Sequence, residues 1–227
     1  MLLRTILIGA LMAGTITGVL FTVIQQFQVT PLILEAETYE SSDTDHAHAQ
    51  EAHSTSSASV DENTQRMLFS LLANVLAGIG FALIAASAIT FSDQKGWRKG
   101  LLWGIAGFMV FFVAPSLGLH PKLPGATGAP LLHQQLWWVS TAAATAAGMA
   151  LLVFAHRLPF KGMGLLLLVA PHLVGAPLPE QAFSSAPESL VQEFVIASTL
   201  ANAAFWLILG ALSGYLLHKL TDDAFLN

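Results

Sequence analysis

The stretch from Thr5 to Thr30 reads TILIGALMAGTITGVLFTVIQQFQVT and contains no Asp, Glu, Lys or Arg. A helix of about 20 apolar residues crosses the hydrocarbon core of a bilayer. This run is longer than the roughly 7–15 apolar residues of a typical signal peptide, and no A-x-A cleavage site closes it. The segment therefore predicts an uncleaved membrane-spanning helix.

Five further segments share this absence of acidic and basic side chains. They are Met67–Ser92, Gly100–Leu119, Leu136–Ala155, Gly162–Pro179 and Phe194–Leu217. Across all 227 residues, 54% are hydrophobic and 10% are charged, and the mean hydropathy is +0.64. About a quarter of the residues of a soluble domain are charged. We therefore predict an all-α, polytopic membrane helix bundle of six transmembrane helices, with residues 1–227 forming a single membrane domain.

The segment Gly162–Pro179 is the weakest of the six predicted spans. It is the shortest, and it contains Pro171, His172, Pro177 and Pro179. Proline removes a backbone donor, so a broken or re-entrant helix is the alternative to a plain crossing. A bundle of five spans is the corresponding alternative topology.

The distribution of Lys and Arg predicts the orientation, because basic residues near span ends stay in the cytoplasm. With six spans, two basic residues, Arg66 and Lys122, fall on one side of the membrane, and seven fall on the other. The seven are Arg4, Lys95, Arg98, Lys99, Arg157, Lys161 and Lys219. We therefore expect both termini to be cytoplasmic.

In this orientation residues 35–66 form an external loop that is acidic and carries histidines. It holds eight of the 14 acidic residues of a chain with a net charge of −5, which makes nucleic acid an unlikely partner. Because residues 41–63 are almost devoid of apolar side chains, we expect the loop to be partly disordered. Imidazole and carboxylate groups together suit divalent Co, Ni, Zn and Cu ions. A metal-binding loop is the prediction, and a merely solvated acidic loop is the alternative.

The sequence argues against an enzyme. It has no cysteine, which excludes disulfides, thiolate metal sites and iron–sulfur clusters. It also has no nucleotide-binding G-x-x-x-x-G-K-[ST] loop, no G-x-S-x-G elbow and no H-E-x-x-H pair. All 14 acidic residues fall outside the six segments, which leaves no acid–base pair within the membrane. We expect no catalytic residues and no tightly bound cofactor.

Prolines recur near the outer ends of the predicted outward-running spans. VAPSLGLHP at 113–121 and VAPHLVGAP at 169–177 match at five positions, and the first span ends at Pro31. Leu-Ala-Asn also recurs, at 72–74 and 200–202. These matches suggest three helical hairpin repeats, each with a proline-interrupted outward helix. Helix breaks would expose backbone carbonyls that coordinate ions, and simple kinks between packed helices are the alternative.

His172 is the only histidine inside a predicted span, and ionisable groups at that depth usually face a cavity or a partner. It is the first candidate for a ligand on a translocation path, with a packing histidine as the alternative. Five of the eight histidines lie outside, which favours capture of a cation from that side. The candidate metal ligands are Glu35, Glu37, His46, His48, His53, His120 and His172.

The first hairpin carries the most specific pattern: a short basic start, a Gly/Ala/Leu span and VIQQFQVTPLILEAETYE leading into the histidine-bearing loop. This pattern resembles the CbtA family of proposed cobalt transporter subunits, most strongly over Arg4–His53 and more loosely over most of the chain. The resemblance implies His46, His48 and His53 as loop ligands, with Glu35 and Glu37 from the LEAE stretch. The family is usually described with five spans.

The resemblance also implies a multi-pass protein of the bacterial inner membrane that imports cobalt for cobalamin synthesis. Its implied partner is CbtB, a small subunit with one span and a histidine-rich end. Only the resemblance favours cobalt as the transported substrate, since Ni and Cu bind equivalent N/O sites more tightly. A nickel or zinc permease and a non-transporting, metal-binding membrane scaffold are the alternatives, and a homo-oligomer is left open.

Overall fold

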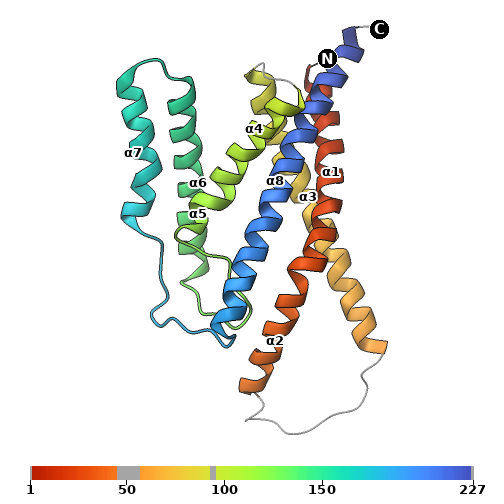
Figure 1. Ribbon diagram of the computed structural model, residues 1–227, viewed down its shortest axis with the longest axis vertical. Helices are drawn as coiled ribbons and strands as arrows, with labels where there is room; N and C mark the ends of the chain where they lie inside the picture. The colour runs from red at the N-terminus through yellow and green to blue at the C-terminus, as the bar shows by residue number, and fades with distance from the viewer. Residues whose placement is uncertain (1, 45–56, 93–95, 226–227) are drawn as a thin grey trace. The chain divides into compact units, whose positions relative to one another are not determined.

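The computed structural model describes the backbone of residues 2–44, 57–92 and 96–225, and the side chains of 2–40, 63–92 and 96–222. Within these ranges every regular element is a helix, apart from an isolated antiparallel bridge between Ala126 and Ser184. The elements are α1 (Leu2–Gln28), α2 (Thr30–Thr44), α3 (Ser57–Phe91), α4 (Trp97–Phe108), the π-helix η1 (Met109–Val113), α5 (Ala114–Ser116), α6 (Leu131–Phe154), α7 (Leu158–Val174) and α8 (Glu188–Phe225) (Figure 1). The predicted all-α class is confirmed for this part of the chain.

Five of the described helices are long and apolar enough to cross a membrane. They are Leu2–Gln28, Asn63–Phe91, the continuous run Trp97–Ser116, Leu131–Phe154 and Glu188–Asp222. The remaining apolar helix, α7, has 17 residues and falls just short. These helices are consistent with the predicted membrane helix bundle. Six spans are not established by helix length, and neither the predicted topology nor the three hairpin repeats are confirmed.

Helix α1 packs as a membrane helix does, burying mainly small residues and exposing large apolar ones. In α1 the buried positions include Gly9, Ala13 and Gly14, whereas Leu7 and Leu11 are about half exposed. Helices in lipid gain little from burying leucine, because the lipid tails are as apolar as the side chain, and they associate where small residues let backbones approach. The exposed leucines form the lipid-facing surface.

The chain divides into two compact units. The first consists of Met1–Pro31, Thr44–Ala106 and Leu200–Asn227, and the second of Leu32–Asp43 and Gly107–Thr199. The run α4–η1–α5 and the helix α8 each contribute residues to both units. A single membrane domain over residues 1–227 remains a prediction.

In the first unit, the backbones of α4 and α8 are in contact at two glycines of each helix. These are Gly100 and Gly104 of α4 and Gly210 and Gly214 of α8. A Cβ atom added to Gly104 would collide with the carbonyl oxygen of Trp206, and one added to Gly214 would lie 2.5 Å from the carbonyl oxygen of Gly96. A Cβ atom added to Gly100 would likewise collide with the carbonyl oxygen of Gly210, and one added to Gly210 would collide with that of Gly100. The two glycines within each helix form a G-x-x-x-G motif, which permits this close approach.

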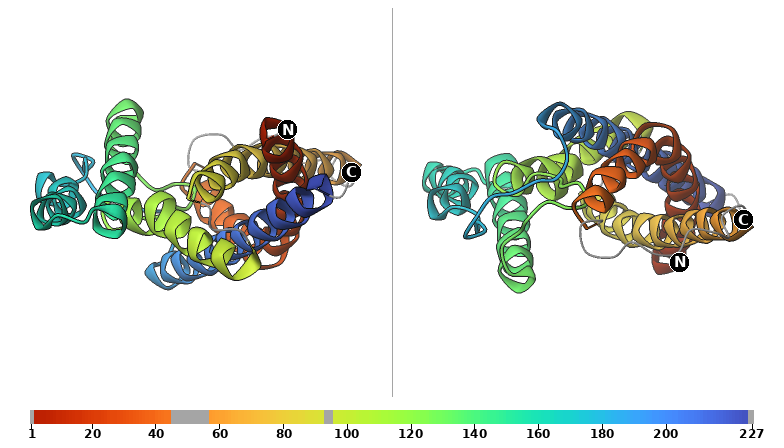
Figure 2. Two further views of the ribbon diagram at one scale, coloured as in Figure 1. Left: turned by 90° about the horizontal axis from the view of Figure 1, so that it is seen from above. Right: turned by 90° about the horizontal axis from the view of Figure 1, so that it is seen from below.

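Helix α1 lies against both α3 and α8 in the first unit (Figure 2). Gly9 lies beside Leu217, and the rings of Phe21 and Phe205 lie 5.0 Å apart. Because residue numbers rise along α1 as they fall along α8, the two helices are antiparallel. The beginning of α1 and the end of α8 therefore lie at the same end of this unit (Figure 1).

Polar side chains also join α1 to α3. The amide nitrogen of Asn74 donates hydrogen bonds to Thr22 Oγ1 at 3.0 Å and to Gln25 Oε1 at 2.6 Å. Thr22 Oγ1 in turn donates to the carbonyl oxygen of Gly18 at 2.9 Å. Asn74, the asparagine of the first Leu-Ala-Asn sequence, thus forms hydrogen bonds between two helices.

Replacement of Asn74 by alanine should lower the free energy of unfolding by about 0.6–1.7 kcal/mol, because interhelical hydrogen bonds in membranes contribute that much. The measurement is the thermal midpoint of the purified protein in detergent. The control is Leu72→Ala, which truncates a side chain on the same helix that is 55% exposed. Equal midpoints for the two variants would contradict a stabilising role for the Asn74 amide.

In the second unit, α6 and α7 form an antiparallel pair. A Cβ atom at Gly148 would lie 2.8 Å from the carbonyl oxygen of Gly164, and one at Gly164 would lie equally close to that of Gly148. At the other end of the pair the loops 117–130 and 175–187 are joined. Thr127 N donates to the carbonyl oxygen of Phe183 at 2.9 Å, and Phe183 N donates to Thr127 Oγ1 at 2.9 Å. Helix α7 thus returns the chain to the end of the unit at which α6 begins.

Candidate functional site

A helix irregularity lies next to each of Pro31, Pro115 and Pro171. Pro31 follows the junction of α1 and α2 at Val29, and Pro115 follows the π-helix Met109–Val113. Helix α7 ends at Val174, three residues after Pro171. Proline cannot donate an N–H, and π-helical turns occur frequently at functional sites. These interrupted helix segments are therefore the candidate region for a site.

The end of α7 is the sharpest of these interruptions. Pro171 has no N–H to donate to the carbonyl of Leu167, four residues before it. The helix stops at Gly175, which adopts φ +84°, a conformation that favours glycine, and whose N–H donates to the carbonyl of Pro171 at 3.0 Å. The predicted span Gly162–Pro179 is therefore corrected: the helix begins at Leu158, and residues 175–179 are not helical.

His172 lies in the last turn of α7 and is partly buried. Its imidazole meets the indole of Trp137 edge-on, with ring centroids 6.2 Å apart and planes at 71°. Trp137 is 8% exposed, and its indole occupies the space where a Cβ atom of Gly118 would otherwise lie. The indole is therefore held between the loop that follows α5 and the end of α7.

His120 lies in a different place, an open groove of about 370 Å³ at the beginning of α6. The groove is lined by Leu119, His120, Lys122, Gln134, Gln135, Trp138 and Val139. Lys122 donates to the carbonyl of Thr127 at 3.2 Å, so its positive charge stays beside the groove. A cation at His120 would be repelled by this ammonium group.

The two glutamates of the LEAE stretch lie on α2. Glu35 is exposed and Glu37 is partly buried. His46, His48 and His53 lie outside the described residues. Among the residues that the structure does describe, no three His, Asp or Glu side chains come close enough together to hold a metal ion. Glu35, Glu37, His120 and His172 therefore do not form one metal-binding cluster in this structure.

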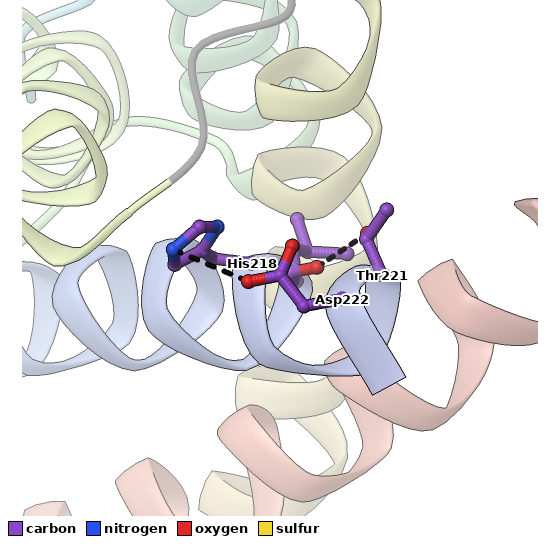
Figure 3. A network of polar contacts seen from close by, with 4 residues as sticks. His218, Thr221 and Asp222 are labelled. Carbon is purple, nitrogen blue, oxygen red and sulfur yellow. Dashed lines mark hydrogen bonds and ion pairs between the residues drawn. The ribbon is translucent and has the colours of Figure 1, made fainter. Parts of the chain in front are cut away.

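A histidine and a carboxylate do meet at the end of α8, outside the predicted spans. His218 Nε2 lies 3.5 Å from Asp222 Oδ2, and Thr221 Oγ1 donates to the carbonyl of Leu217 at 2.6 Å (Figure 3). Both members of the pair are 59% exposed. Exposed pairs spaced four residues apart on a helix contribute little to stability. We assign this contact no functional role.

Helix α6 carries polar residues that the sequence analysis did not select. Trp137, Thr141 and Thr145 are 8%, 0% and 4% exposed, and their side-chain polar atoms have no hydrogen-bond partner within the described part of the chain. The spacing of four residues was visible in the sequence and places all three on one helical face. That this face is buried was not visible.

Comparison with known proteins assigns the chain to a family. The family described as "Probable cobalt transporter subunit (CbtA)" matches residues 3–218, nearly the whole chain. No match was found among the curated proteins or the solved structures. The family is described as one of probable transporter subunits, and the long apolar helices fit a multi-pass membrane protein. The chain therefore belongs to the CbtA family of probable cobalt transporter subunits.

Proposed function

We propose that this protein is the membrane subunit of an importer of divalent transition metals, with cobalt as its substrate. An external His/Glu/Asp segment captures the cation, and the proline-interrupted helices pass it inward. The observation that carries the proposal is the break of α7 next to His172, which combines an imidazole with a helix end inside an apolar bundle. Helix ends and interrupted helices are where membrane transporters coordinate ions.

The proposed topology has six crossings in the bacterial inner membrane, with both termini in the cytoplasm. The antiparallel arrangement of α1 and α8 supports an even number, because the chain leaves and returns at the same end of the first unit. Helix α7 has 17 residues and is about 26 Å long at 1.5 Å per residue. The five residues from 175 to 179 can add up to about 16 Å. Together they are long enough for a core of about 30 Å.

The proposed capture step involves residues 35–66, including Glu35, Glu37, His46, His48 and His53. A small CbtB-like subunit with one span and a histidine-rich end would complete the pathway, in keeping with the description of the family as a subunit. The arrangement needs no tightly bound cofactor, and the metal ion is the substrate.

Replacement of His46, His48 and His53 together by alanine should raise the cobalt concentration needed for half-maximal uptake by about tenfold. The maximal rate should change little. The reason is that a capture segment that concentrates the ion acts through effective concentration and not through the path itself. The control is His218→Ala, which removes an exposed histidine at the other end of the chain. A fall in the maximal rate with unchanged half-saturation would contradict a capture role.

The proposal is tested by uptake of radioactive cobalt in a transport-deficient bacterial host, with and without the small partner. Nickel and zinc serve as competitors. Cobalt uptake that depends on this chain and resists excess nickel supports cobalt as the substrate, whereas stronger uptake of nickel or zinc supports the alternative permeases. Metal binding by membranes without any uptake would support a non-transporting scaffold and would exclude the importer.

A further inference from the structure

The buried face of α6 that carries Trp137, Thr141 and Thr145 is the face that packs on α7. Gly148, which follows Thr145 by three residues, contacts Gly164 and Leu168 of α7, and Trp137 contacts His172. Residues spaced by three and four positions share one side of a helix. Thr141 and Thr145 therefore lie along the α6–α7 interface, between these two contacts.

The hydroxyls of Thr141 and Thr145, like those of Thr17, Thr90 and Ser213, are buried without a hydrogen-bond partner in the described part of the chain, and only the first two lie on the α6 face that packs on α7. Thr22, Ser140 and Thr199 each donate to the carbonyl four residues earlier, at 2.9, 2.8 and 2.7 Å. This backward bond is the usual way in which a threonine or serine is satisfied within an apolar helix. Thr141 Oγ1 and Thr145 Oγ1 are buried without it. A buried hydroxyl without a partner is unfavourable in an apolar environment, so a partner is expected in another state.

Helix α7 also carries polar groups near its end. The carbonyl of Leu167 receives no N–H from Pro171, and the imidazole of His172 lies at the same end as Trp137. Thr141 and Thr145 are 0% and 4% exposed, so neither lipid nor another subunit reaches them in this arrangement. The missing partner must be small enough to enter between two helices.

We infer that the interface formed by Trp137, Thr141 and Thr145 of α6 with Leu167 and His172 of α7, the α6–α7 polar strip, admits a partly hydrated divalent cation. Imidazole is a ligand of first-row divalent ions, carbonyl oxygen and water suit the harder of them, and threonine hydroxyls can hydrogen-bond to the water that the ion carries. The indole N–H of Trp137 cannot bind a cation, and it donates to the water that accompanies the ion. The indole also closes the strip beside Gly118.

The close approach of α6 and α7 at Gly148 and Gly164 marks the other end of the strip. There each glycine leaves no room for a side chain on its partner, so the helices are in direct backbone contact. An ion that has entered past Trp137 can therefore continue between the helices beyond this point only if this contact opens. The identity of the ion in this inference rests on the proposed transport function. The entry of water into the strip does not depend on that function.

The absence of cysteine from the chain permits a direct test. Thr141→Cys and Thr145→Cys introduce single thiols into the strip, and Ala143→Cys places one between them on the exposed, lipid-facing side of α6. A thiol reacts as its thiolate, which forms in water and not in hydrocarbon. In membrane vesicles, both threonine variants should react with a small cationic methanethiosulfonate about tenfold faster or more than Ala143→Cys. Equal rates for the three variants would overturn the inference.

Cobalt should protect the thiols. At ten times its half-saturating concentration, a cation in the strip should slow the labelling of Thr145→Cys about tenfold by mass action. Fast labelling that cobalt does not slow would show a hydrated strip that is not the path of the ion, and would overturn the assignment. The labelling rate is measured without any transport assay. Failed cobalt uptake by the unmodified protein would therefore reject the proposed function, while the labelling rates would still test whether water enters the strip.

A second variant separates the strip from simple packing. Thr141→Val combined with Thr145→Val keeps the shape of both side chains and removes both hydroxyls. Thermal stability should be retained or raised, because two unpaired buried hydroxyls disappear, while cobalt uptake should fall about tenfold with the loss of two polar contacts. Unchanged uptake by a stable double variant would refute a role in transport.

Discussion

Replacement of His172 by alanine is expected to reduce cobalt uptake by tenfold or more while the protein remains folded in the membrane. Loss of an outer partner of a metal ligand already lowers metal affinity about 10–100-fold, so loss of a ligand should cost at least as much. His172 is only partly buried, so its removal should not unfold the helix pair. The measurement is the initial rate of cobalt uptake, normalised to the amount of protein in the membrane.

His172→Phe distinguishes a ligand from a packing residue. Phenylalanine can retain the edge-on ring contact with Trp137, seen at 6.2 Å, but offers no nitrogen to a cation. We expect this variant to be as defective as His172→Ala, and His133→Ala, an exposed histidine at the beginning of α6, to behave as the unmodified protein. Normal uptake by His172→Phe would assign the imidazole to packing and would favour a scaffold that merely binds metal.

Replacement of Gly210 is expected to have the largest effect on stability. A Cβ atom at this position would lie 2.6 Å from the Cα atom of Gly104 and would collide with the carbonyl oxygen of Gly100. Backbone atoms cannot rotate away as a side chain can, so α4 and α8 must separate. Overpacking of this kind costs about 1–3 kcal/mol. Gly210→Ala should lower the thermal midpoint, and Gly210→Leu should prevent recovery of a monodisperse protein in detergent.

Gly80 provides the matched control, because a Cβ atom there meets nothing within 4 Å. In a helix interior alanine is favoured over glycine by about 1 kcal/mol, so Gly80→Ala should leave the thermal midpoint unchanged or raise it. Both glycines lie in helices of the first unit. Similar loss of stability in Gly80→Ala and Gly210→Ala would show that general helix effects, and not the α4–α8 contact, explain the result.

The uncharged runs predicted the central parts of the long helices better than the ends of those helices. The run Phe194–Leu217 lies within α8, which extends from Glu188 to Phe225. The first and last turns of this helix contain charged residues, because a helix can continue beyond the hydrocarbon core into water. The absence of charge marks the part of a helix that lies in lipid and carries no information on the turns outside it.

The G-x-x-x-G motifs of α4 and α8 can be read from the sequence, and in the structure they pack against each other. The motif identified a helix face of small residues but not the helix that packs on it. Likewise, proline predicted interruptions near Pro115 and Pro171, but not that one would appear as a π-helix and the other as a helix end. The run that contains Pro115 ends at Ser116, and α7 ends where Gly175 adopts a positive φ.

Composition and spacing by themselves determined that this chain is a bundle of membrane helices and that His172 is an unusual residue within it. These conclusions follow from the free energy of transfer of side chains into lipid, which is a property of each residue. Only the tertiary structure decided that Trp137, Thr141 and Thr145 are buried, unpaired and directed at α7. Which face of α6 is covered depends on the glycines that bring two helices together, and such a pairing is a property of both helices and of neither sequence alone.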